Sequence, residues 1–143
     1  MERAAPPIRT RWTIEIAMAH PAVDKSGKLI VNRLRDNAIK HFDLLATQHY
    51  AAPGLKPLQG DLASLTKEQR NIVRRCVISS IDNALHGFLF GLVEANDADE
   101  GITVIVDGQN IAELSDGLHG EQFTDEGWIA KFGAFDESGE ASG

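Results

Sequence analysis

The hydrophobic positions of the chain change their spacing near residue 100. Before that point, apolar residues recur every three or four positions, which is the period of a helix. After it, they alternate with polar residues over short runs, which is the period of a strand. Because the helices come first and the short strands last, the pattern predicts an α+β domain rather than a doubly wound parallel sheet.

Two long helices are predicted, over about 29–50 and about 66–94. The apolar residues of the first share one helical face: Val31, Leu34, Ala38, Phe42 and Leu45. The second begins with Thr66 and Gln69, which have the spacing of a capping box. Its apolar stripe is so broad that we expect the helix to be covered on most sides, with Cys76 buried as an inert thiol.

A small antiparallel β-meander is predicted for the C-terminal third, packed against the two helices. Ile102–Val106 is rich in β-branched residues and predicts a strand, and Asp107-Gly108 predicts the tight turn that follows it. Residues 110–114 and 128–132 are the candidates for the second and third strands.

The chain is expected to form one globular domain over residues 1–135. The last residues, 136–143, are acidic and nearly free of apolar side chains, so we expect a disordered tail there. Residues 56–60 are interpreted as a linker between the two long helices. Residues 12–18 alternate as a strand does but also fit a helix, and the sequence leaves both interpretations open.

The charge is distributed unevenly around a net value of −7. Residues 1–60 are net basic, whereas residues 101–143 contain one basic residue, Lys131, among many acidic ones. The sequence pI of about 5.1 argues against nucleic-acid binding. With Cys76 as its one cysteine, and without a secretory signal or membrane-spanning run, the sequence favours a cytoplasmic protein without disulfides.

The strongest functional signal lies in residues 115–135, where acidic residues alternate with aromatic ones. This combination is typical of a surface that captures a basic protein partner. The favoured function is therefore a non-catalytic protein-binding domain of bacterial type, such as an immunity or antitoxin-like inhibitor. The steering charges would be Asp116, Glu121, Asp125 and Glu126, and Trp128 would be the anchor.

The alternative is a small-ligand or metal-binding protein, enzymatic in one version, centred on Asp82 and His86. These residues are four positions apart on the second helix, so they share a face, and folding could bring His119 to them. A plain structural interpretation is a satisfied polar network. The sequence contains no recognisable catalytic or metal motif, so no cofactor is predicted. A homodimer through Gly87 and Gly91 is left open.

Overall fold

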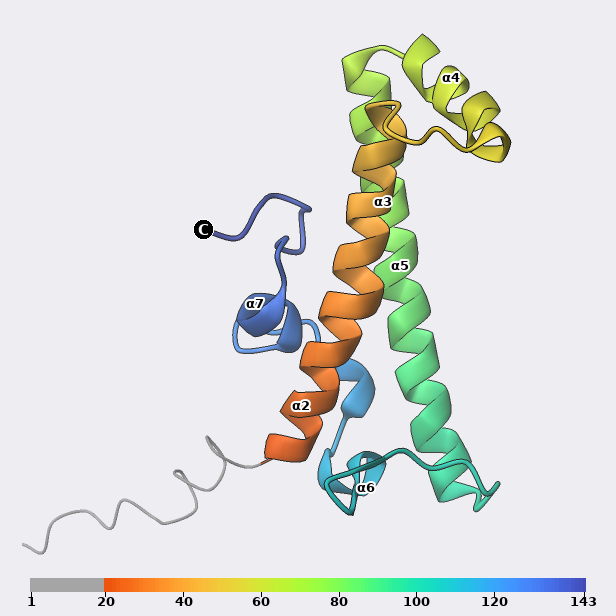
Figure 1. Ribbon diagram of the computed structural model, residues 1–143. Coiled ribbons are helices and arrows are strands. Elements are labelled where there is room, and N and C mark those ends of the chain that lie inside the picture. The colour runs from red at the N-terminus through yellow and green to blue at the C-terminus, as the bar shows by residue number, and fades with distance from the viewer. Residues whose placement is uncertain (1–19) are drawn as a thin grey trace, which may run out of the picture.

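The computed structural model describes residues 20–143, most of which are helical. Two helical rods run side by side (Figure 1). The first rod consists of three consecutive helices: α2 (Pro21–Ile30), the π-helical η1 (Val31–Arg35) and α3 (Asp36–Ala46). The second rod is α5 (Lys67–Asp97). Residues 12–18, for which strand and helix were left open, lie outside the described residues.

The π-helical segment changes which side chains of the first rod are buried. Leu34, expected on the apolar face, is 51% exposed, whereas Arg35 is 0% exposed. A π-helical turn holds an extra residue, so the buried face moves around the rod at this point. The predicted bounds of 29–50 are also wrong: Pro21 starts the rod at a position that tolerates proline, and Ala46 ends it.

The connection between the rods is helical, which corrects the linker predicted at residues 56–60. It contains the 3-10 turn η2 (Pro53–Leu55) and α4 (Lys56–Ser64). Pro57 lies in the first turn of α4, where its missing N–H costs no hydrogen bond. Gln59 is buried and forms two 2.9 Å hydrogen bonds with the backbone of Tyr50, one as donor and one as acceptor. These bonds fix α4 against the end of the first rod.

Helix α5 begins where the sequence predicts. The Thr66 hydroxyl accepts a hydrogen bond from the Gln69 amide at 3.1 Å, and the Gln69 side chain accepts one from the Thr66 amide at 2.9 Å, so the capping box is confirmed. The expectation that α5 is covered on most sides is wrong. Phe88 and Phe90 are 56% and 43% exposed, and Cys76 is exposed rather than buried.

By length and composition, α5 is a helix that could cross a membrane, and only 28% of its most apolar window is buried. Core helices of water-soluble proteins pass the same test, so this property is weak support for a membrane role. The helix packs against α3 on one side and against the 3-10 turn η3 (Leu118–Gly120) near its C-terminal half.

The C-terminal third contains a two-stranded antiparallel sheet instead of a meander. Strand β1 (Ile105–Val106) pairs with β2 (Gln109–Asn110) around Asp107 and Gly108. Both turn residues have positive φ, 51° and 77°, which confirms the predicted tight turn. The expected strand over Ile102–Val106 is reduced to its last two residues. A mostly helical chain with a small antiparallel sheet is the part of the predicted fold that holds.

Helices replace the third predicted strand and most of the second, of which only Asn110 lies in a strand, at the end of β2. Ile111–Leu114 forms α6, whose start is capped by the Asn110 side chain accepting a hydrogen bond from the Ala112 amide at 3.1 Å. Trp128–Phe132 forms α7, which begins directly after Gly127. Both segments are short apolar runs, whose period does not separate a buried strand from a buried helical turn.

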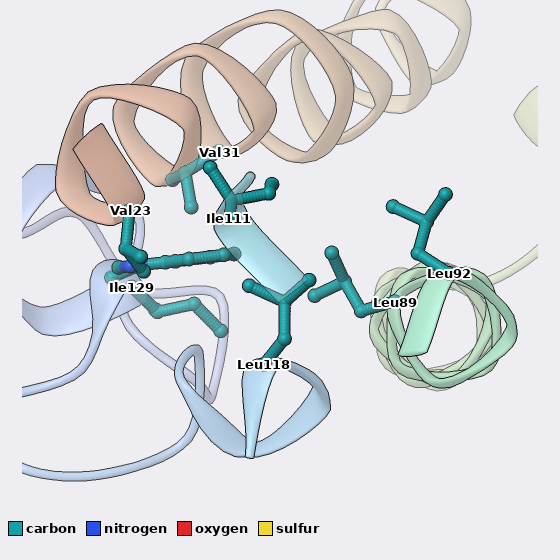
Figure 2. Packing of buried hydrophobic residues seen from close by; sticks show 8 residues of the cluster. Val23, Val31, Leu89, Leu92, Ile111, Leu118 and Ile129 are labelled. Atoms are coloured by element: carbon teal, nitrogen blue, oxygen red, sulfur yellow. The ribbon is translucent and has the colours of Figure 1, made fainter. Parts of the chain in front are cut away.

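The main core lies where α2, α5 and the C-terminal third meet, as Figure 2 shows. Its buried side chains come from all three regions: Val23, Val31, Leu89, Leu92, Ile111, Leu118, Trp128 and Ile129. The indole of Trp128 lies directly over Gly27, where a side chain would overlap the ring. The absence of a Cβ at Gly27 therefore lets α7 approach α2 closely.

The segment expected to be a disordered tail makes several contacts with the two rods. Arg35 donates hydrogen bonds to the backbone carbonyls of Phe135 and Asp136, both at 2.8 Å. Arg74 donates to the carbonyl of Gly139 at 2.7 Å, and Phe135 forms a β-bridge with Ala141. We refer to residues 135–141 as the C-terminal strap. Two arginines from different rods thus hold one segment of the chain.

Candidate functional site

Only some of the residues predicted to form the acidic surface are exposed in the structure. Asp116, Asp125 and Glu126 are exposed, but Glu121 is half-buried and accepts a hydrogen bond from the Ser115 hydroxyl at 2.6 Å. Trp128 is 1% exposed inside the core, so a partner cannot reach it, and its role as an anchor is wrong. Three exposed carboxylates remain for the proposed contact with a basic partner.

The alternative site is partly assembled by the fold. His86 and His119 come together, with ring centroids 5.3 Å apart at nearly right angles. Asp82 is paired instead with the buried Arg35, whose guanidinium donates to both carboxylate oxygens at 2.7 and 3.3 Å. Within residues 20–143, no three side chains of the metal-ligating types gather around one point. The metal version of the alternative therefore has no ligand set in this part of the chain.

The hydrogen bond of His86 fixes which of its ring nitrogens carries a proton. Its Nδ1 lies 2.8 Å from the backbone carbonyl of His119. A carbonyl oxygen only accepts hydrogen bonds, so Nδ1 must be the protonated nitrogen. In the neutral ring, Nε2 then keeps its lone pair and is free to accept a hydrogen bond.

A cavity of about 600 Å³ lies between α5 and the C-terminal strap, and we refer to it as the strap cavity. Its lining combines one stripe of α5 with Phe123 and two strap residues: Arg75, Ile78, Ser79, Asp82, Asn83, His86, Phe123, Glu137 and Ser138. The strap itself turns around Asp136. Hydrogen bonds from Ser138 are the main cause that lowers the pKa of the Asp136 carboxyl below its ordinary value.

A second hollow of about 570 Å³ lies between the first rod and α5, and we refer to it as the α2–α5 groove. Its apolar lining comes from α2, α5 and the sheet region: Leu29, Ile30, Phe88, Leu92, Val104, Val106 and Ile111. Leu29 and Phe88 are 62% and 56% exposed. The hollow thus presents large hydrophobic side chains that the described fold does not cover.

The rim of the α2–α5 groove is basic although the chain as a whole is acidic. Lys25, Lys28 and Arg33 line it, all exposed on the first rod. Lys25 pairs with Asp107 at 2.9 Å, while Lys28 and Arg33 form no ion pair with another residue of the range 20–143. The groove therefore combines an apolar floor with a net positive edge.

Sequence patterns did not identify the α2–α5 groove because its walls come from three distant segments. Leu29 and Phe88 are almost sixty positions apart, and each looks like an ordinary member of an apolar helical face. The alternation of Val104 with Val106 was the one local signal that pointed to a shared face. Comparison with protein-family models, curated proteins and solved structures finds no match to this chain.

Proposed function

We propose that the protein is a non-catalytic protein-binding domain and that the α2–α5 groove holds its partner. The observation that carries the proposal is the exposure of Leu29 and Phe88 over one apolar hollow. Monomeric soluble proteins rarely expose contiguous apolar patches of large size, and such patches commonly mark interaction sites. The hollow also lies beside the main core, because Leu92 and Ile111 belong to both.

The partner that fits best is an amphipathic helix with acidic residues beside its apolar face. A groove between two helices can bind the apolar face of a third helix. The third helix contacts the groove through apolar side chains at helical spacing. Lys28 and Arg33 on the rim favour carboxylates on the partner, because complementary charge raises the rate and specificity of association.

Two labelled helical peptides test this proposal. Both carry leucines at helical spacing; one is flanked by glutamates and the other by lysines. Fluorescence anisotropy at low and high salt gives the affinity of each for the protein. We expect the acidic peptide to bind more tightly at low salt and its advantage to shrink as salt screens the rim.

A matched pair of variants tests whether the peptide binds in the groove. Phe88→Glu introduces a charge into the lining, whereas Phe90→Glu changes an exposed phenylalanine of the same helix that does not line the groove. The first should weaken binding at least about tenfold, as loss of a central apolar contact does, and the second should leave it unchanged. Failure of both peptides to bind, or equal loss in both variants, would overturn the proposal.

The sequence alone predicts a basic partner instead, and a separate variant tests that competing prediction. Replacing Asp116, Asp125 and Glu126 by lysine removes the exposed carboxylates of the acidic segment. If the lysine-flanked peptide binds more tightly and this triple variant abolishes its binding, the acidic surface is the partner site. The groove proposal requires that the triple variant leaves the affinity of the acidic peptide undiminished.

A further inference from the structure

The strap cavity has a polar wall that belongs to a single face of α5. Arg75, Ser79 and Asn83 are spaced four apart, and Asp82 and His86 continue the same stripe. From Arg75 to His86 the stripe covers roughly 16 Å along the helix axis, at 1.5 Å per residue. The cavity volume of about 600 Å³ lies in the range of small-molecule sites.

The lining of the cavity carries two opposite charges that form no ion pair with each other. Arg75 of α5 and Glu137 of the strap both line it, and neither forms an ion pair with any residue in the described range 20–143. The third charged side chain of the lining, Asp82, is already neutralised by Arg35. The cavity therefore offers one cation and one carboxylate to a ligand.

Two apolar side chains, Ile78 and Phe123, also belong to the lining. Ile78 lies between Arg75 and Asp82 on the helix and is 3% exposed, and its Cδ1 atom also packs close to Gly139 of the strap. Phe123 is 40% exposed and lies beside His86, with ring centroids 5.9 Å apart. An apolar body in the cavity would therefore lie against the exposed ring of Phe123.

We infer that the strap cavity binds a free α-amino acid with an apolar side chain. The carboxylate of the ligand pairs with the Arg75 guanidinium, its ammonium group pairs with Glu137, and its side chain lies against Phe123. A guanidinium recognises a carboxylate through two parallel hydrogen bonds, which suits this assignment. None of the cavity residues lines the α2–α5 groove, so this inference is independent of the proposed protein-binding function.

The strap supplies one wall of the site. Glu137 and Ser138 reach the cavity only because Arg35 and Arg74 hold the strap against the rods. A ligand that pairs with Glu137 stabilises this arrangement further, because binding to the folded state adds to its stability.

Titration of the ¹⁵N-labelled full chain with L-phenylalanine tests the inference. Two analogues serve as probes of the two charges: N-acetyl-phenylalanine lacks the ammonium group, and phenethylamine lacks the carboxylate. We expect L-phenylalanine at millimolar concentrations to shift the amide signals of Ser79, Asn83 and Glu137. Each analogue should bind at least about tenfold more weakly, as expected when one charged contact is left unpaired.

Variants assign the effect to the two charged residues. Arg75→Gln and Glu137→Gln should each weaken binding of L-phenylalanine, while Arg33→Gln, on the groove rim, should not. Both cavity residues are exposed, and the dispersion of the amide spectrum shows directly that each variant is folded. Absence of shifts with L-phenylalanine, equal binding of either analogue, or unchanged affinity in both cavity variants would overturn the inference.

Discussion

Arg35 carries a charged side chain, yet the fold buries it completely. A fully buried guanidinium needs a partner for its charge and acceptors for its N–H groups. Asp82 supplies the charge, and the carbonyls of Phe135 and Asp136 supply two further acceptors. One side chain thus joins the first rod, α5 and the strap, which makes it central to the packing of the whole chain.

Removing one partner of this buried pair should be far more costly than removing a partner of the exposed pair nearby. Asp82→Ala leaves the Arg35 charge buried and unpaired, and we expect a loss of about 3–5 kcal/mol in the free energy of unfolding. Asp43→Ala breaks the more exposed pair with Arg74 and should cost about 1 kcal/mol or less. Urea denaturation of both variants gives the comparison, and similar losses would contradict the burial described for Arg35.

The strap should loosen in acid because of Asp136. Its Oδ1 accepts hydrogen bonds from the Ser138 hydroxyl and amide and from the Glu140 amide, and the bonds from Ser138 chiefly keep its pKa below the ordinary value. The stabilisation is present above the unfolded pKa of about 3.9 and is lost as the pH falls through the lower folded pKa.

Amide hydrogen exchange at Ser138 and Glu140 measures this effect. Protection of both amides should fall as the pH drops below about 4, after correction for the intrinsic rate. Asp136→Asn should lower their protection already at neutral pH and remove most of the pH dependence. Protection that does not change between pH 6 and acid conditions would show that the carboxylate does not stabilise the turn within the strap.

Residue types alone predicted some of these environments and missed others. The capping box of α5 was predictable because both of its residues lie within one turn and act on each other. The burial of Arg35 in place of Leu34 was not predictable, because it depends on a π-helical turn and on an acceptor 47 positions away. The pairing of His86 with the His119 carbonyl depends in the same way on a contact between distant segments.

At the scale of elements, α2 and α7 pack closely against each other at Gly27. Trp128 fills the space that a side chain at position 27 would need. A glycine inside a helix weakens it. At position 27 of α2, however, the glycine leaves room for Trp128, which is among the largest fully buried side chains of residues 20–143.

A pair of glycine substitutions separates helix propensity from packing. Gly27→Ala should destabilise the protein by about 1–3 kcal/mol because the new methyl group overlaps the Trp128 indole. Gly87→Ala, inside α5 where no atom approaches, should stabilise it by about 0.5–1 kcal/mol. Denaturant unfolding measures both, and a stabilising Gly27→Ala would contradict the placement of Trp128.

The sequence predicted the long elements more accurately than the short ones. Helix α5 was predicted to within a few residues because its stripe extends over many turns and its start carries a cap. The segments of α6 and α7 are only four and five residues long, so a strand and a helical turn bury the same apolar residues. Their conformation is decided by Asn110 and Gly127 at their starts and by contacts with the core.

At the scale of the whole molecule, α5 presents two different surfaces. One side lines the apolar α2–α5 groove with its basic rim, and another lines the strap cavity with its Arg75 and Glu137 side chains. Both hollows combine residues from distant parts of the chain, which explains why the sequence did not identify either as a unit. The acidic residues that dominated the sequence interpretation are divided between exposed positions and internal hydrogen bonds such as that of Glu121.

The most direct test of the central claim is a selection from a random peptide library on the immobilised protein, with Phe88→Glu used in parallel. The groove account predicts that peptides enriched on the wild-type chain carry apolar residues at helical spacing with Asp or Glu beside them, and that Phe88→Glu does not retain them. Enrichment of basic peptides, equal retention by Phe88→Glu, or no enrichment at all would contradict it.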